Sequence, residues 1–215
     1  MTDKKVGPPK QRNYQQAFDL ACAALREMEL HERAERAGAN YSKGEEGEKI
    51  RIPFFFESYE IRLPQVEFYS PSQKAVSLVS RVLMLHYLLR ADGTPVSGRW
   101  VAYKEVPGAL LYGAVFARRV TEPLEKKFGR SARLFGEAGL RLGGEPGPVG
   151  DASLFLRALP RVPLQLVLWE GAEEFPPKVQ FLFDSTVHHY LPLEDMVVLG
   201  QMAAGRMIHQ LTHVE

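Results

Sequence analysis

Two apolar runs separated by a short turn, residues 164–169 and 179–183, constrain the fold of this chain most. Apolar runs of this length, bounded by glycine and proline, are typical of paired β-strands. The turn is crowded with acidic, aromatic and proline residues, namely Trp169, Glu170, Gly171, Glu173, Glu174, Phe175, Pro176 and Pro177. We therefore expect a hairpin whose tip is a working surface, although no reaction can be read from it.

The composition narrows the class of protein. With 215 residues, 45% hydrophobic and 25% charged, the chain is long enough and apolar enough to form a globular core. Its formal net charge of +1 provides no basic excess for a phosphate backbone, so we expect no nucleic-acid partner. The single cysteine, Cys22, excludes an internal disulfide and an iron–sulfur cluster held by this chain alone.

The chain shows no targeting or membrane signal. Residues 1–15 are charged and contain no apolar core of a secretory signal. The longest apolar run, near residues 76–89, is interrupted by polar side chains and is too short to span a bilayer. We expect a cytoplasmic protein without a membrane partner.

Periodicity predicts a flexible tail at residues 1–11 and a single α+β domain at 12–215. Helices are expected at 14–37, 72–90, 112–128, 131–142 and 192–211, and strands at 49–56, 59–68, 99–103, 152–156, 164–169 and 178–184, with loops at 42–49 and 143–150. The helix at 72–90 is apolar nearly all round, which is typical of a buried central helix. We expect a largely antiparallel sheet packed against it and against peripheral helices, with the first two strands joining the later ones in one sheet.

The hairpin tip holds the first candidate groups. Glu173 and Glu174 next to Trp169 can supply a general acid or bind a cation. The alternative is a solvated acidic turn with Trp169 packed in the core.

Two histidines form the second set of candidate groups. His86, beside Tyr87, lies on an apolar helix face and needs a polar neighbour such as Glu105 or Asp184 to act as ligand or base; otherwise it is a hydrogen-bonded core residue. His188, shortly after Asp184, can contribute to a divalent metal site or to an axial haem position; otherwise it is a loop residue.

Several motifs occur in a specific order: LHYL at 85–88, GxWVxxxExPG at 98–108 with Tyr112 after it, LGG at 142–144, LPxxPLxxxLWxGxEEFPP at 159–177 and LFDSxxxxYLPxED at 182–195. In this order the chain resembles an uncharacterised domain-of-unknown-function family, number thirty-seven eighty-six, of anaerobic bacteria and archaea. The resemblance implies a link to iron–sulfur or corrinoid metabolism, and it supplies no catalytic residues.

Three hypotheses follow. The first is a cofactor- or partner-binding accessory protein of anaerobic metabolism, with a tetrapyrrole such as haem, or a corrinoid, favoured as the small-molecule ligand. The second is an acid/base or metal-assisted hydrolase or lyase that uses Glu173, Glu174 and Asp184. The third is a structural subunit of a redox complex. The expected ligand-binding residues are His86, Tyr87, Trp100, Glu105, Tyr112, Trp169, Glu173, Glu174, Asp184 and His188, while catalytic and metal-ligating residues stay unassigned.

Overall fold

The computed structural model describes residues 9–45 and 47–210, with side chains from residue 13 onward. The described chain divides into two compact units. The first contains the described residues up to Ile52 together with Glu57–Gly93, and the second contains Pro53–Phe56 and the described residues from Thr94. The prediction of a single domain at 12–215 remains a prediction.

A four-stranded sheet forms the centre of the first unit. Its strands, in the order β1-β2-β3-β4, are β1 Asn40–Gly44, β2 Gly47–Phe54, β3 Glu57–Leu63 and β4 Glu67–Tyr69. The strands alternate as the sequence predicts: Ile50 and Ile52 are fully buried, and Arg51 between them is exposed. One face of this sheet is therefore apolar and the other is charged.

Three helices belong to the first unit: α1 Pro9–Arg26, α2 Leu30–Ala37 and α3 Leu78–Arg90. The rings of Phe18 in α1 and Phe68 in β4 lie 6.2 Å apart, which places α1 against the apolar face. Nearly every position of α3 from Val82 to Leu88 is buried, as expected for a central helix. Its first turn is capped by Ser77, whose hydroxyl accepts a hydrogen bond from the Ser80 N–H at 3.1 Å.

The second unit contains a five-stranded antiparallel sheet in the order β5-β9-β8-β7-β6. These strands are β5 Trp100–Ala102, β6 Glu145–Gly147, β7 Ala152–Leu159, β8 Val162–Trp169 and β9 Lys178–Asp184. Between β5 and β6 the chain forms η1 Tyr103–Glu105, η2 Leu110–Tyr112, α4 Gly113–Phe116, the π-helix η3 Ala117–Thr121, α5 Glu122–Phe128 and α6 Ala132–Arg141. After β9 come η4 Val187–His189 and α7 Leu193–His209.

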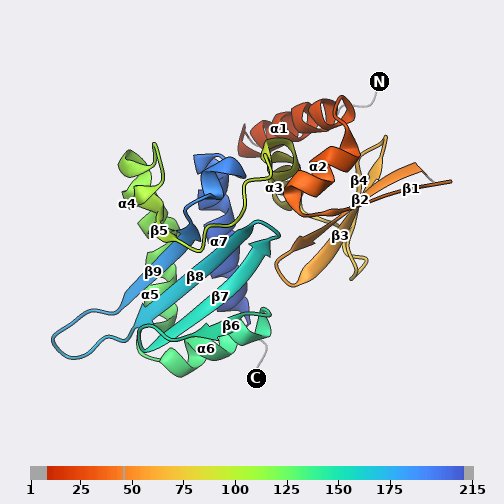
Figure 1. The fold of residues 1–215 in the computed structure, drawn as a ribbon. Helices are drawn as coiled ribbons and strands as arrows, with labels where there is room; N and C mark the ends of the chain where they lie inside the picture. Colours follow the sequence, from red (N-terminus) through yellow and green to blue (C-terminus); the bar gives the residue numbers. More distant parts are fainter. Residues whose placement is uncertain (1–8, 46, 211–215) are drawn as a thin grey trace. The chain divides into compact units, whose positions relative to one another are not determined.

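The core of the second unit lies between its sheet and its helices. Helices α5 and α6 pack on one face of the sheet and α7 packs beside them (Figure 1). Leu154, Leu166 and Phe181 are register partners on three adjacent strands, and all three are buried. In this register β8 and β9 form the hairpin that the two apolar runs predict. The α+β class is confirmed.

The expectation of one joined sheet is wrong, because each unit has its own sheet. The loop expected at 42–49 is wrong, because β1 and β2 pair there from Asn40↔Arg51 to Gly44↔Gly47. The loop at 143–150 contains β6, which pairs with β7. The two strands predicted as loops, β1 and β6, lie at sheet edges and have no fully buried side chain, so they lack the apolar alternation that marks a strand in sequence. The single strand predicted at 59–68 is also wrong, because β3 and β4 form an antiparallel pair there.

Several predicted boundaries also shift. The predicted helix at 14–37 is two helices, and the hairpin turn placed at Glu57 and Ser58 lies at Phe55 and Phe56 instead. The helix predicted from residue 72 begins at Leu78. Of the predicted tail at 1–11, residues 9–11 belong to α1, and residues 1–8 lie outside the described residues. Among the described helices, none combines the length and the apolar composition that a membrane crossing requires.

Candidate functional site

Hydrogen bonds anchor the loop between β8 and β9, residues 170–177, to the turn after α5 at its start and to α5 itself just after its end. The Gly171 N–H donates to the Gly129 carbonyl at 2.8 Å, and the Val179 N–H donates to the Glu125 carboxylate at 2.9 Å. The Glu170 carboxylate accepts from the Ala132 N–H, the first residue of α6. An acidic group at a helix N-terminus is favourable there. The base of the loop is therefore fixed.

The tip of this loop projects into solvent. Phe175 is 69% exposed, and Glu173 and Glu174 beside it are also exposed. An open cavity of about 580 Å³ lies along the loop and is lined by Arg130 and by the loop residues Gly171, Ala172, Glu173, Glu174, Phe175, Pro176 and Pro177. Trp169, at the end of β8, is half-buried. Glu173 and Glu174 thus lie on the accessible surface that the sequence predicts.

Asp184 is the last residue of β9, at the end of the strand that is far from the loop 170–177. Its carboxylate is buried and accepts hydrogen bonds from the Gly98 N–H at 2.7 Å, from the Ser97 N–H at 3.1 Å and from the Thr186 hydroxyl at 2.6 Å. Burial raises the pKa of this carboxyl, but the hydrogen bonds from Thr186 and Ser97 together outweigh it, so the pKa lies below its ordinary value. Asp184 therefore ties two segments together as an ionised acceptor.

The structure does not bring the three predicted carboxylates together. The seven residues of β9, Lys178–Asp184, separate Asp184 from the loop, a length of about 20 Å at the rise of an extended strand. Glu173 and Glu174 can work as neighbours on one loop, whereas Asp184 cannot join them. The three carboxylates therefore do not form one site, and the acid/base hypothesis stays a prediction.

The stretch of the second unit from β5 to η2 contains three more of the predicted residues: Trp100, Glu105 and Tyr112. Trp100 is the register partner of Asp184, and its ring lies 5.6 Å from that of Phe155 across the sheet. The Glu105 carboxylate accepts from the Ala102 N–H at 2.6 Å and so caps η1. Tyr112 is 50% exposed at the end of η2. Of these three, Tyr112 is the most accessible.

His86 and Tyr87 belong to α3 of the first unit, whereas the other predicted residues belong to the second unit. The Tyr87 ring is fully buried, and its hydroxyl donates to the Ala37 carbonyl at 2.5 Å, so this side chain fastens α2 to α3. His86 is half-buried on the same helix. The sequence predicted both as ligand-binding, and for Tyr87 the contacts are those of a structural residue.

His188 lies in η4, where its Nδ1 atom is 3.0 Å from the Ser185 carbonyl oxygen and its ring is 4.2 Å from that of His189. The bond to Ser185 fixes the ring orientation. Within residues 9–45 and 47–210, the structure gathers no group of three or more histidine, cysteine, aspartate or glutamate side chains suited to a metal ion.

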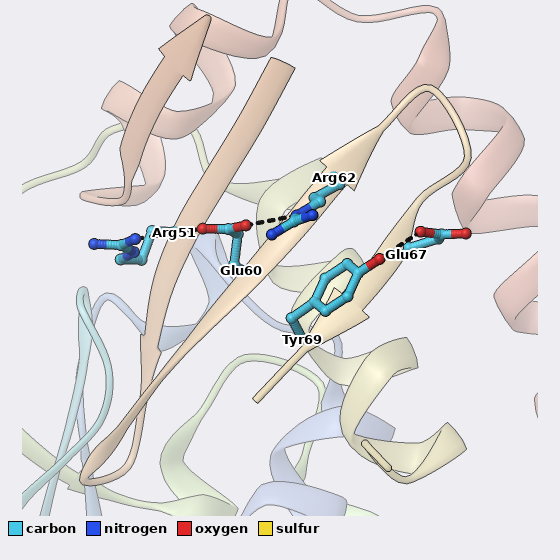
Figure 2. Close-up of polar contacts among 5 residues, drawn as sticks. All are labelled: Arg51, Glu60, Arg62, Glu67 and Tyr69. Carbon is cyan, nitrogen blue, oxygen red and sulfur yellow. Dashed lines mark hydrogen bonds and ion pairs between the residues drawn. The ribbon is translucent and has the colours of Figure 1, made fainter. Parts of the chain in front are cut away.

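A polar cluster that the sequence analysis missed covers the charged face of the first unit's sheet (Figure 2). Glu60 lies between Arg51, at 3.3 Å, and Arg62, at 2.7 Å. The Arg62 guanidinium lies 4.2 Å from the centre of the Tyr69 ring, and the Tyr69 hydroxyl donates to Glu67 at 2.7 Å. The hydrogen bond from Arg62 lowers the pKa of Glu60, and the one to Glu67 raises the pKa of Tyr69.

In this cluster, each arginine contacts the carboxylate of Glu60 or the ring of Tyr69. Cross-strand pairs of this kind stabilise a sheet, so the contacts of this cluster need no bound ligand to explain them. The alternating exposed positions of β2 and β3 were the available signal in the sequence, because they put Arg51, Glu60 and Arg62 on one face.

The comparisons with known proteins add one match. A family model described as "Domain of unknown function (DUF3786)" matches residues 29–206, which is most of the chain. No curated protein and no solved structure matches the chain.

Proposed function

The chain belongs to the DUF3786 family of domains of unknown function, and we propose that it is a non-catalytic accessory protein that binds a protein partner through the loop between β8 and β9. We place this role in the cytoplasm and in anaerobic metabolism, following the expectation of a cytoplasmic protein and the family resemblance.

The observation that carries the proposal is the exposure of Phe175 on a loop with a fixed base. A phenylalanine side chain that moves from water into a partner's pocket contributes about 1.5–3 kcal/mol. The hydrogen bonds from Gly171 and Val179 hold the loop ends, and a loop ordered before binding loses less entropy when it binds. The loop therefore has the properties of a binding element.

The charges beside Phe175 indicate the kind of partner. Glu173 and Glu174 precede the ring, and Pro176 and Pro177 follow it. Charged residues at the rim of an interface increase the association rate and select the partner by complementarity. We therefore expect an apolar pocket with lysine or arginine at its rim on the partner protein.

A tetrapyrrole or corrinoid ligand is a narrower alternative within the same class. None of the residues that line the loop cavity is a histidine, so an axial donor such as His86 or His188 has to come from elsewhere. The absorbance spectrum of the protein purified from its own host tests this alternative: a Soret-like or corrinoid band supports it, and a colourless protein contradicts it.

The partner proposal is tested by photo-crosslinking in cells that produce the protein naturally. Phe175 is replaced by p-benzoylphenylalanine, and the matched control carries the same residue in place of Leu20, which is 65% exposed on α1. We expect a discrete crosslinked product from position 175 and none from position 20.

Reversing the charge of the loop distinguishes specific binding from chance contact during crosslinking. Adding Glu173→Lys and Glu174→Lys to the crosslinking variant should remove the product, because the two acids then repel a basic rim. Equal products from positions 175 and 20, or a product that survives the charge reversal, would contradict the proposal.

A further inference from the structure

A groove lies in the second unit beside the first half of β9. It has a volume of about 230 Å³ and is lined by residues of β5, η1, α4, η3 and β9: Ala102, Tyr103, Lys104, Gly113, Phe116, Ala117, Thr121, Lys178, Val179, Gln180 and Phe181. We infer that this groove, called the β9 groove below, binds a small organic anion with a flat apolar body. The inference is independent of the partner loop.

Both charged side chains that line the β9 groove are lysines. Lys104 and Lys178 are among its lining residues, and none of the others is an aspartate or a glutamate. Among the contacts of the described residues, neither ammonium group takes part in an ion pair. The neighbouring Glu105 and Glu125 carboxylates accept backbone N–H bonds from Ala102 and Val179. The two amines are thus available to a ligand.

Aromatic rings form the apolar part of the groove. The Tyr103 and Phe116 rings are stacked, with centroids 4.5 Å apart and planes 10° apart, and the Phe116 and Phe181 rings meet edge to face at 5.6 Å. Tyr103 and Phe116 are almost fully buried, so neighbouring residues hold these rings in place. The rings form a rigid floor, and the half-buried lining residues Ala102, Gly113 and Ala117 offer a flat apolar group more exposed surface.

The backbone at the groove is itself unusual. Ala117 and Thr121, the first and last residues of the π-helix η3, both line it. A π-helical turn is wider than an α-helical one, is rare, and occurs frequently at functional sites. This observation supports a binding role and does not depend on the two lysines.

The volume limits the ligand. Pockets that bury drug-sized molecules have volumes of about 300–1,000 Å³, so the β9 groove takes a smaller molecule. Two unpaired amines beside a rigid apolar wall match a carboxylate or a phosphate attached to one planar group. A tetrapyrrole does not fit in this volume.

The test is a titration of the full-length protein with phenyl phosphate, benzoate, benzyl alcohol and benzylamine, followed by the backbone amide NMR signals of Gly113, Ala117 and Gln180. We expect saturable shifts with at least one of the two anions. Benzyl alcohol and the cation benzylamine should bind at least about tenfold more weakly, since they lack the charge that the amines recognise. The stronger of the two anions identifies phosphate or carboxylate as the preferred group.

Two variants test the residues. Lys104→Gln with Lys178→Gln should weaken binding of the better anion about tenfold or more, whereas Lys126→Gln with Lys127→Gln, which changes two exposed lysines of α5, should leave it unchanged. Ala117→Phe, which fills the groove and keeps both amines, should also abolish the shifts. Absence of saturation with both anions, or equal weakening by both lysine pairs, would overturn the inference.

Discussion

At the scale of single residues, the buried carboxylate of Asp184 connects segments that lie far apart in the sequence. It accepts hydrogen bonds from Ser97 and Gly98 before β5 and from Thr186 after β9. Hydrogen bonds to a charged group contribute more to stability than neutral ones. The sequence marked Asp184 as a candidate for catalysis, whereas its contacts are those of a residue that organises the chain.

Removal of this acceptor should destabilise the protein. We expect Asp184→Ala to lower the free energy of unfolding by about 1–3 kcal/mol, because several hydrogen bonds lose their charged acceptor together. Urea unfolding measures this change. Glu173→Ala, at an exposed acid of the loop, is the control and should stay within about 0.5 kcal/mol of the unchanged protein. Equal effects of the two substitutions would refute the structural role.

The same residue predicts a pH dependence. Because the pKa of Asp184 is lower in the folded protein than the ordinary value of 3.8, folding favours its ionised form. This stability is fully present above the unfolded pKa and is lost as the pH falls through the folded pKa. Unfolding measured from about pH 6 to about pH 2 should therefore show a gap between the protein and Asp184→Asn that narrows with acid. If the difference in stability between the two proteins does not change with pH, the predicted role of the Asp184 charge is wrong.

Cys22 allows a prediction of reactivity. The thiol is buried in α1, and burial raises its pKa, so little reactive thiolate forms at neutral pH. We expect a thiol reagent such as Ellman's reagent to react slowly with the folded protein and rapidly in urea. Equally fast reaction in both conditions would show that this part of α1 opens readily.

At the scale of elements, apolar stripes explain why a predicted helix breaks. Leu25 of α1 and Leu30 of α2 are both buried, but five residues in one continuous helix turn through about 500°, which puts their side chains about 140° apart. The interruption between α1 and α2 lets both leucines reach the core. Periodicity predicted one continuous helix with its apolar stripe in the first part, and it missed the buried side of α2, which Leu30, Ala34 and Ala37 form.

Helix α6 allows a matched test of packing against β7. A Cβ atom at Gly139 would overlap the buried Leu154 side chain, whereas one at Gly136 meets nothing within 4 Å. We expect Gly139→Ala to destabilise the protein by about 1–3 kcal/mol through overpacking. Gly136→Ala should stabilise it by about 0.5–1 kcal/mol, because alanine favours a helix. Thermal unfolding of both variants measures the difference, and the same sign for both would show that α6 does not pack as described.

At the scale of the whole molecule, the presence of two sheets raises the question of whether the two units unfold together. The chain passes between the units at three places, after Ile52, after Phe56 and after Gly93. The segment Pro53–Phe56, which is the end of β2 and the turn before β3, belongs to the second unit. We therefore expect unfolding of one unit to disturb the other. This connectivity favours the single cooperative domain that the sequence predicts.

Both tryptophans, Trp100 and Trp169, belong to the second unit, so their fluorescence reports on that unit, whereas far-ultraviolet circular dichroism reports on both. We expect the two thermal transitions to coincide, as for a two-state protein. Separate midpoints for the two signals would show that the units unfold independently and that the single-domain prediction is wrong.

The candidate site was predictable where it depended on local sequence. The loop with Phe175 lies between two apolar runs, and turn chemistry predicted its exposure. The β9 groove was not predictable, because Lys104 and Lys178 come from segments 74 residues apart in the sequence, and only the pairing of β5 with β9 brings those segments together. The π-helix also leaves no pattern that a 3.6-residue periodicity detects.

The sequence by itself determined the α+β class, the apolar faces of the strands, the buried central helix and the acidic hairpin loop, because each depends on the periodicity of neighbouring residues. The tertiary structure decided that the strands form two sheets, that Asp184 lies at the far end of β9 from Glu173 and Glu174, and that Lys104 lines a groove with Lys178. These features depend on which strand pairs with which, and many pairings satisfy the same local pattern until side chains pack.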